Sequence, residues 1–391
     1  MTLVLVAAVF LFINPFKRNR NEVPRPFVAS DLITELTSHI VQRGLPPEEY
    51  LSGLFDSREV VFVAEYGQIR QHVEVIARTI PLLHARGVRR LGLEIVLFED
   101  SDRIDTILTA SDFDETAVHG IFFNRMIIWG FSEYVDIFRS AWEVNRGLHD
   151  DEEPFRIVGL STRANWQEIE TEQEAEDPEV IARVYEDGLP DSVMADIIMS
   201  EFVRKGEAAL VLTEMSHAFT SYLSIKYVER AEEIGLSEAR RAGNIVYDII
   251  GSRAATVLFH APWPYKKARN LVVHPVQGSI DGTIENLPEE WSAAGFDVAG
   301  TPFAELSARR SDFFYGYEDL VLSELADGYI ITGPIASYEM VTPIPEFITA
   351  ENIDEAIRGF PGPNIEGVTP EELNAYIASL IEGRKRIIDL F

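Results

Sequence analysis

The sequence contains no cysteine, so disulfide bridges, thiolate metal sites and a cysteine nucleophile are excluded. Basic residues are scarce: 34 Lys and Arg stand against 64 Asp and Glu, which gives a formal net charge of -30. Such a charge repels the phosphates of nucleic acids and the headgroups of anionic lipids. We therefore expect no nucleic-acid partner, and a small molecule as the substrate or ligand.

Several short motifs that carry a known chemistry are also missing. The sequence has no Gly-x-Ser-x-Gly turn around a serine nucleophile, no phosphate-binding loop, no dinucleotide fingerprint and no His-Glu-x-x-His zinc motif. The common serine hydrolases, nucleotide-binding enzymes and zinc peptidases that depend on these motifs are therefore excluded.

The sequence also lacks a hydrophobic run of the roughly 20 residues that a membrane span needs. Residues 1–16 are mostly apolar and precede a basic cluster at 17–20, but they show neither the basic start nor the cleavage site of a signal peptide. We interpret residues 1–20 as a short membrane anchor, which would place the protein at the cell envelope. The basic cluster weakly favours a cytoplasmic body. A signal-like segment and a buried N-terminal strand are the alternatives.

The pattern of hydrophobic residues predicts an α/β fold. The chain has 391 residues, of which 46% are hydrophobic, enough for a large core. Short apolar runs typical of buried strands alternate with patterns typical of amphipathic helices. The strand runs begin near residues 60, 91, 155, 208 and 255. We predict one α/β domain over residues 28–345, with a mainly parallel central sheet and helices on both faces.

Residues 346–391 are predicted to form a C-terminal helical tail. Thr369-Pro370-Glu371-Glu372 matches a capping box with proline at the first helical position. Apolar residues on one stripe of the following helix are typical of a docking face within the chain or of a homodimer contact. A homodimer through this helix is therefore one expected partnership.

Ionisable residues end several of the predicted strands. The run at 60–63 leads to Glu65, the run at 91 leads to Glu94, and later runs end near Glu214, His217 and His260. Because parallel strands present their carboxyl ends at one edge of a sheet, these groups are expected to converge. Carboxylates with imidazoles suit a divalent zinc, manganese or iron ion, or a general base that activates water.

We select Glu65, Glu94 and His217 as the candidate catalytic residues and as the candidate metal ligands. Each of them alone would more often be a satisfied structural group. Their convergence supports a site, because buried unpaired carboxylates cost several kcal/mol and rarely accumulate without a function.

Five short motifs resemble one known superfamily, in order along residues 55–335. They lie at residues 61–72, 92–94, 129–134, 155–159 and 211–218. The superfamily is that of the erythromycin esterase-like and ChaN-like haem-uptake lipoproteins, with the TraB and Tiki proteins. Its first strand ends in Gly-Glu followed closely by His, its second ends in Glu, and a His follows a later strand. Glu65, Glu94 and His217 occupy those positions, whereas Ala64 replaces the Gly, and Gly67 or Gln68 replaces the nearby His.

The resemblance implies an α/β fold with metal-assisted or general-base hydrolysis of an ester or amide, or binding of a tetrapyrrole. In a haem or metal carrier without turnover, Tyr66 and Tyr134 are the candidate axial ligands. His72 and His260 are further candidates for cofactor binding, and His72 is expected on the same rim as Glu65. Because the family His is replaced, a degenerate scaffold without activity is a third reading.

Overall fold

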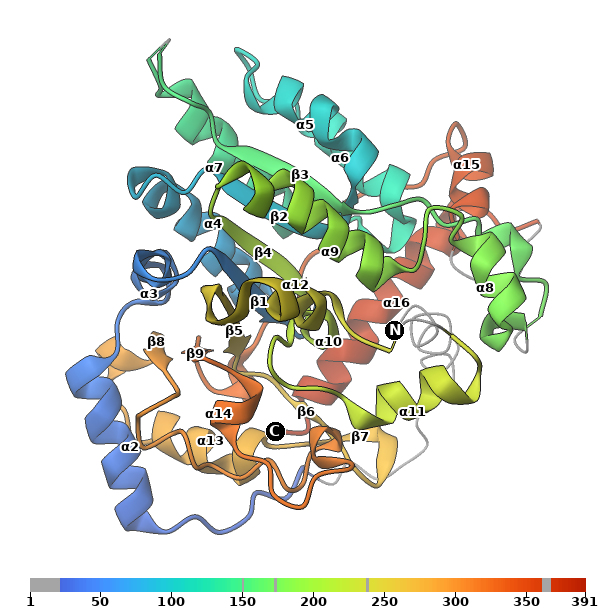
Figure 1. Ribbon diagram of the computed structural model, residues 1–391. Helices are drawn as coiled ribbons and strands as arrows, with labels where there is room; N and C mark the ends of the chain where they lie inside the picture. The colour runs from blue at the N-terminus through green and yellow to red at the C-terminus, as the bar shows by residue number, and fades with distance from the viewer. Residues whose placement is uncertain (1–21, 150, 172–173, 237–238, 361–366) are drawn as a thin grey trace.

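A seven-stranded sheet runs through the centre of the computed structural model, which describes residues 22–149, 151–171, 174–236, 239–360 and 367–391. Its strand order is β3-β2-β4-β1-β5-β9-β8 (Figure 1). The strands are β1 (Val60–Glu65), β2 (Arg90–Leu97), β3 (Arg156–Ser161), β4 (Ala209–Glu214), β5 (Ala254–Phe259), β8 (Ala294–Asp297) and β9 (Gly328–Ile331). Only β8 pairs antiparallel, with β9, while the other neighbours are parallel.

Helices cover both faces of the sheet, each over its own hydrophobic core. On one face lie α3 (Pro47–Gly53), α4 (Arg70–Ala85), α5 (Ser101–Leu108), α6 (Glu115–Arg125), α7 (Ser132–Arg146), α8 (Pro178–Val184), α15 (Ile353–Arg358) and α16 (Pro370–Ile388). On the other lie α2 (Ser30–Arg43), α9 (Pro190–Glu201), α10 (Met215–Ala218), α12 (Ala242–Ile250), α13 (Ser279–Ile284) and α14 (Leu322–Leu325). The predicted α/β fold with helices on both faces is therefore confirmed.

Smaller elements complete the fold. Helix α11 (Ile225–Glu233) follows β4 and α10, and a separate antiparallel pair is formed by β6 (Trp263–Tyr265) and β7 (Ala268–Val273). Short 3-10 turns link many of the larger elements. The edge strand β8 was not expected from the sequence.

The composition of β1 explains its central place. All six residues of the strand are buried. The side chains of Val61 and Val63 enter the core beneath α4 and α7, whereas those of Val60, Phe62 and Ala64 enter the core beneath α9 and α12. A strand covered on both faces has no solvent side, so a continuous apolar run replaces the usual alternation. The strand then delivers Glu65 to the carboxyl edge of the sheet.

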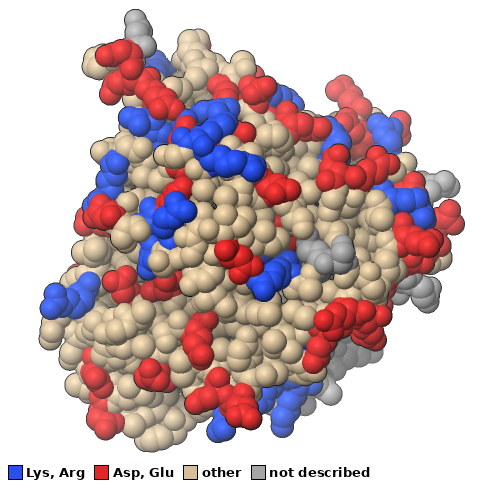
Figure 2. Space-filling model, in the orientation of Figure 1, with Lys and Arg blue, Asp and Glu red and all other residues tan. Residues whose placement is uncertain are grey.

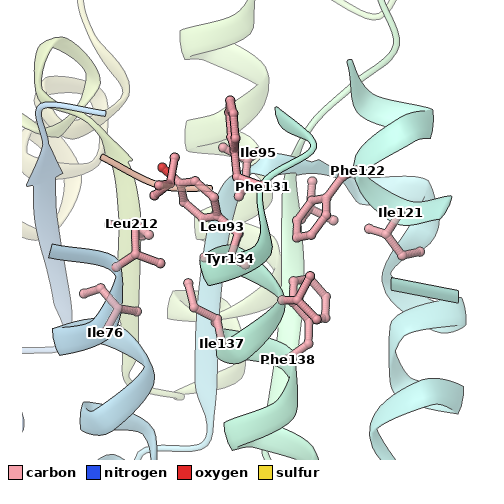
Figure 3. Close-up of a cluster of buried hydrophobic side chains, with 14 of the residues drawn as sticks. Ile76, Leu93, Ile95, Ile121, Phe122, Phe131, Tyr134, Ile137, Phe138 and Leu212 are labelled. Carbon is pink, nitrogen blue, oxygen red and sulfur yellow. The ribbon is translucent and has the colours of Figure 1, made fainter. Parts of the chain in front are cut away.

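Helix α7 brings aromatic side chains onto the sheet beside α4. Figure 3 shows Tyr134 and Phe138 of α7 beside Phe122 of α6. Leu93 of β2 and Leu212 of β4 belong to the same cluster. The rings of Phe122 and Phe138 meet edge to face, with centroids 5.5 Å apart. This packing fixes the position of Tyr134, whose hydroxyl reaches the carboxyl edge.

The C-terminal helix α16 packs on the same chain. It begins with the predicted capping box: the Thr369 side chain accepts from the Glu372 N–H at 3.2 Å, and the Glu372 carboxylate accepts from the Thr369 N–H at 2.9 Å. Its apolar stripe, Leu373, Ile377, Ile381 and Ile388, is buried in the core on the α4 face. The stripe is thus occupied within the chain, and a homodimer through this helix stays a prediction.

On the face drawn in Figure 2, the acidic side chains are spread among basic ones and form no single patch.

The proposed anchor at residues 1–20 lies outside the described residues, and no helix in the described ranges has the length and apolar character to span a membrane. The membrane location therefore stays a prediction.

Candidate functional site

The first element of the site is the tight turn that follows β1. Gly67 and Gln68 both have positive φ angles, +91° and +66°, in the left-handed region where a residue other than glycine is strained. The turn folds back so that the Gln68 N–H donates to Oε1 of Glu65 at 3.1 Å. The Tyr134 hydroxyl donates to the same oxygen. Two donors from separate elements therefore hold the Glu65 carboxyl group at the end of its strand.

The second element is Glu94 in β2. The register between β2 and β3 shifts between Leu93 and Leu97, and such an irregularity can re-aim a side chain. Oε2 of Glu94 accepts a hydrogen bond from the backbone N–H of Glu214 at 2.7 Å. The main chain of β4 thereby fixes the orientation of the Glu94 carboxylate.

The third element is His217, which lies in the short helix α10 directly after β4. Its Nε2 is 3.6 Å from Oε1 of Glu94, and its Nδ1 is 2.5 Å from Oδ1 of Asp191 at the start of α9. His217 and Asp191 are 3% and 2% exposed. The imidazole therefore lies between two carboxyl groups, away from solvent.

A pocket opens where these elements meet, with about 400 Å³ of empty space that includes open solvent. Glu65 and Glu94 both face it, and His217 stands behind Glu94. The lining consists of Glu65, Tyr66, Gly67, Gln68, Glu94, Ile95, Trp129, Leu212, Thr213, Glu214 and Arg384. The structure thus brings the three predicted residues to one place, with the two carboxyl groups nearest the pocket.

Burial tunes the acids of the pocket. It raises the pKa of Glu65 to about 7, against the opposing effect of the hydrogen bonds from Tyr134 and Gln68. Burial and the nearby Glu94 charge also raise the pKa of Glu214, which ends β4 in register with Glu65. An acid with a pKa near 7 can both accept and donate a proton at neutral pH.

The pKa values of His217 and Asp191 shift so that the charged form of each group is favoured. Burial alone would lower the pKa of His217, but the charges of Asp191 and Glu94 outweigh it and raise that pKa. Burial alone would raise the pKa of Asp191, but the charges of His217 and Arg241 outweigh it and lower that pKa. The pair therefore favours an imidazolium facing a carboxylate.

The remaining predicted residues divide between two places. Tyr66 lines the pocket, and the guanidinium carbon of Arg384 lies 5.1 Å from the centre of its ring. His72 and His260 are absent from the lining that the described residues form. His72 stacks on Phe259 with ring centroids 4.2 Å apart, and burial lowers its pKa to about 3.

His260 belongs to a second buried cluster, beyond the end of β5. Its Nδ1 lies 3.0 Å from the Tyr329 hydroxyl, and its Nε2 lies 3.5 Å from Oδ1 of Asp281. Nδ1 of His274 lies 2.8 Å from the same carboxylate oxygen. The sequence placed His260 at the same edge, but the fold gives it different partners.

Within the part of the chain that the structure describes, no group of three or more His, Asp or Glu side chains is arranged to hold a metal. In the first cluster, Nδ1 of His217 is taken by Asp191 and one oxygen of Glu94 by a backbone N–H. The residues present therefore do not fit the predicted zinc, manganese or iron site.

Sequence reasoning missed two side chains of this region. Asp191 follows Pro190 in the first turn of α9, where an acid is an ordinary helix-start residue and gives no sign of a site. Arg384 lies on α16 and reaches the pocket only because that helix packs across the carboxyl edge. Neither residue belongs to a strand end, the one signal that the sequence offered.

The comparisons with known proteins give a fold. No protein-family model matches the sequence, and no curated protein matches it. Solved structures do match: a Bacillus cereus protein at 10% identity and TM-score 0.52 covers 82% of this chain and 100% of its own. A succinoglycan biosynthesis protein at 9% identity and TM-score 0.53 covers 81% and 99%. At these identities the two matches establish the fold alone.

A third match bears on the resemblance seen in the motifs. A variant of the erythromycin esterase EreC in its open conformation is 11% identical with TM-score 0.45, covering 84% of this chain and 99% of its own. A ChaN structure is also among the matches. The erythromycin esterase and ChaN names of the motif resemblance therefore recur among the matched structures, consistent with that resemblance at the level of the fold alone.

Proposed function

We propose that this protein is a hydrolase that uses Glu65 as a general base to cleave an ester or amide bond of a small molecule. The observation that carries this proposal is a carboxyl group with a pKa of about 7 facing a pocket beside a second carboxylate, Glu94. A catalytic base works best when its pKa lies near the working pH.

The chemistry needs one water molecule between Glu65 and the carbonyl carbon of the substrate. Glu65 takes a proton from the water as its oxygen bonds to that carbon, and the protonated Glu65 then gives the proton to the leaving oxygen or nitrogen as its bond breaks. Negative charge develops on the carbonyl oxygen. Arg384 is the one basic side chain among the described lining residues, and its charge can offset that development.

The Tyr134 hydroxyl and the Gln68 N–H support the role of Glu65. Both donate to Oε1, so they fix the carboxyl group in one orientation. Pre-organised positioning of a base lowers the cost of reaching the reactive geometry. The strained backbone at Gln68 is consistent with a turn that is kept for the site.

Haem transport is the second candidate function, and it is less well supported because its candidate axial ligands are engaged in other contacts. The Tyr134 hydroxyl is engaged with Glu65, and its ring is fully buried. Arg384 covers the ring of Tyr66. Three acidic residues, Glu65, Glu94 and Glu214, line the pocket and would repel the two propionates of haem. The hydrolase reading needs none of these contacts to change.

The test is a screen of the purified full chain against chromogenic esters and amides, followed by Glu65→Gln on any substrate that is cleaved. We expect turnover to fall about 10²- to 10⁴-fold, as for loss of a general base. The acid limb of the pH profile should lie near pH 7, because Glu65 must be deprotonated to act. Glu99→Gln, at an exposed position outside the pocket, is the matched control.

Two measurements on the same sample separate the alternatives. A Soret band in the absorbance spectrum would support the haem carrier, and stoichiometric zinc, manganese or iron would support metal-assisted hydrolysis. Turnover that is unchanged in Glu65→Gln would contradict the proposed role of this residue. Absence of turnover, colour and metal would favour a degenerate scaffold.

A further inference from the structure

Asp191 lies behind the pocket, at a position that no motif marks. Its Oδ1 is 2.5 Å from Nδ1 of His217, and both residues are almost completely buried. The two residues are 26 positions apart in sequence and meet in the folded chain, where Asp191 in the first turn of α9 reaches His217 in α10. An acid at this depth requires partners, because an unpaired buried carboxylate is costly.

The partners of Asp191 hold it from two further directions. Its Oδ1 accepts from the backbone N–H of Ala242 at 2.8 Å, and its Oδ2 pairs with the guanidinium of Arg241 at 2.9 Å. The guanidinium in turn lies over the ring of Tyr227, with its carbon 3.3 Å from the ring centre. Asp191 therefore has little freedom to turn away from His217.

His217 is held equally on its other side. Its Nε2 is 3.6 Å from Oε1 of Glu94, and the second oxygen of Glu94 is fixed by the backbone N–H of Glu214. A neutral imidazole carries one N–H and can donate to only one of the two carboxylates, whereas an imidazolium carries two and can serve both. The arrangement of two anchored carboxylates about one ring thus matches the protonated form.

We propose that Asp191 is a positioning residue, which holds the His217 ring through Nδ1, aims its Nε2 at Glu94 and so fixes the Glu94 carboxylate toward the pocket. His217 then acts through Glu94 and does not contact the substrate. This inference rests on the proposed hydrolytic function of the same pocket. It extends that function by assigning the buried side chains that no motif identifies.

All charged groups that face His217 enter this balance. Asp191 from α9, Glu94 from β2 and Glu214 from β4 are acidic, and Arg241 at the start of α12 is basic. The acids favour the imidazolium and Arg241 opposes it. With three acidic residues and one basic residue around it, the protonated form of the His217 ring is favoured.

The test is nitrogen NMR of the full chain labelled at its eight histidines, with His217 assigned by comparison with His217→Gln. We expect both ring nitrogens of His217 to be protonated at pH 7, with a titration midpoint above the ordinary value of about 6.5. In Asp191→Asn, which keeps the size and removes the charge, the midpoint should fall by about one pH unit, a tenfold loss of proton affinity. A neutral His217 in the wild type, or a midpoint that Asp191→Asn leaves unchanged, would overturn the proposal.

Two further variants keep the test decisive. Arg241→Gln removes the opposing charge and should raise the His217 midpoint, so it tests the same balance if Asp191→Asn does not fold. Asp281→Asn, in the second His–Asp cluster, is the matched control and should leave the His217 signals unchanged. A His217 signal that responds equally to Asp281→Asn would show a general loss of structure and count against the assignment.

A kinetic readout separates this inference from the proposed function. On any cleaved substrate, Asp191→Asn should lower kcat about 10- to 100-fold and leave KM unchanged, as for loss of a side chain that orients a carboxylate of the pocket. An imidazolium at His217 without any hydrolysis would support the positioning role and contradict the hydrolase. Hydrolysis with a neutral His217 would do the reverse.

Discussion

Two buried clusters of histidine and aspartate lie beyond the carboxyl ends of β4 and β5, the two strands that flank β1, and they differ in what surrounds them. In the first, His217 follows β4 and lies between Asp191 and Glu94. In the second, His260 follows β5, and Asp281 lies between His260 and His274. The residue types and the place in the sheet are alike. Only the first cluster adjoins the pocket, through Glu94.

The clusters also differ in how completely their polar atoms are paired. Each oxygen of Asp191 has an anchoring partner. In the second cluster, Nδ1 of His274 and Nε2 of His260 both approach the same oxygen of Asp281, at 2.8 and 3.5 Å, whereas Oδ2 of Asp281 has no hydrogen-bond partner among the described residues. A strand-end histidine therefore joins the candidate site through its access to the pocket and its ordered partners, and its residue type alone does not decide this.

The largest effect is expected for Asp281→Asn, which removes the charge of the acid that His260 and His274 share. Burial alone would raise the pKa of Asp281, but His260 and His274 outweigh it and lower that pKa, so the ionised acid stabilises the fold above its ordinary titration range. Removing one member of such a buried pair should lower the free energy of unfolding by about 3 to 5 kcal/mol at pH 7, measured by urea denaturation.

Two features of that experiment keep it specific. The loss should shrink as the pH falls through the ordinary range of aspartate, because the wild-type acid is then protonated in the unfolded chain and its advantage disappears. Turnover per folded molecule should stay at the wild-type value. A large loss of turnover in Asp281→Asn would mean that the second cluster serves the reaction as well.

The next prediction concerns the stability that the protein loses when the buried Glu65 is ionised. The folded state binds a proton on Glu65 up to a pH of about 7, whereas the unfolded chain releases it near pH 4.5. The free energy of unfolding therefore falls as the pH rises between these values. Glu65→Gln removes this cost and should stabilise the protein by on the order of 3 kcal/mol at pH 8, with the gain vanishing near pH 4.5.

Urea denaturation of both proteins at several pH values measures this effect, and Glu99→Gln at an exposed site is again the control. A gain in stability together with the loss of turnover would mark Glu65 as a residue kept for function at the expense of the fold. A variant that is less stable than the wild type at pH 8 would contradict the environment assigned to Glu65.

The smallest predicted effect is a gain in stability when His72 is replaced. This ring stacks on Phe259, and its buried nitrogens make no well-aligned hydrogen bond with the described residues, the backbone of His260 being a weak partner. His72→Phe keeps the ring and removes two poorly paired nitrogens, so it should stabilise the protein by about 1 kcal/mol at pH 7. Turnover should not change, because His72 does not line the pocket formed by the described residues.

The pH dependence of this variant gives a second check. Burial lowers the pKa of His72 to about 3, so below about pH 6.5 the unfolded chain gains a proton that the folded chain does not. The wild type therefore loses stability toward acid, and the advantage of His72→Phe should grow between pH 6.5 and pH 3. His149→Phe, at an exposed position, is the matched control. A loss of turnover in His72→Phe would mean that His72 contributes to the reaction.

Much of the fold could be predicted from the sequence because its signals are local. A strand buried on both faces must be apolar throughout, so the runs that became β1, β2, β3, β4 and β5 stand out without any knowledge of their neighbours. The direction of parallel strands then placed Glu65, Glu94 and His217 at one edge. The capping box at Thr369 likewise marked the start of α16.

Only the tertiary structure decided which polar groups share a site. The contact of His217 with Asp191, the reach of Arg384 from α16 to the pocket, and the burial of His72 against Phe259 join segments far apart in the chain. Local periodicity and strand ends carry no information on such pairs, because each side chain suits its own helix or strand equally well with another partner. The sequence determined the sheet and the edge that collects its acids, and long-range packing determined which of those acids face a pocket and which imidazole stands behind them.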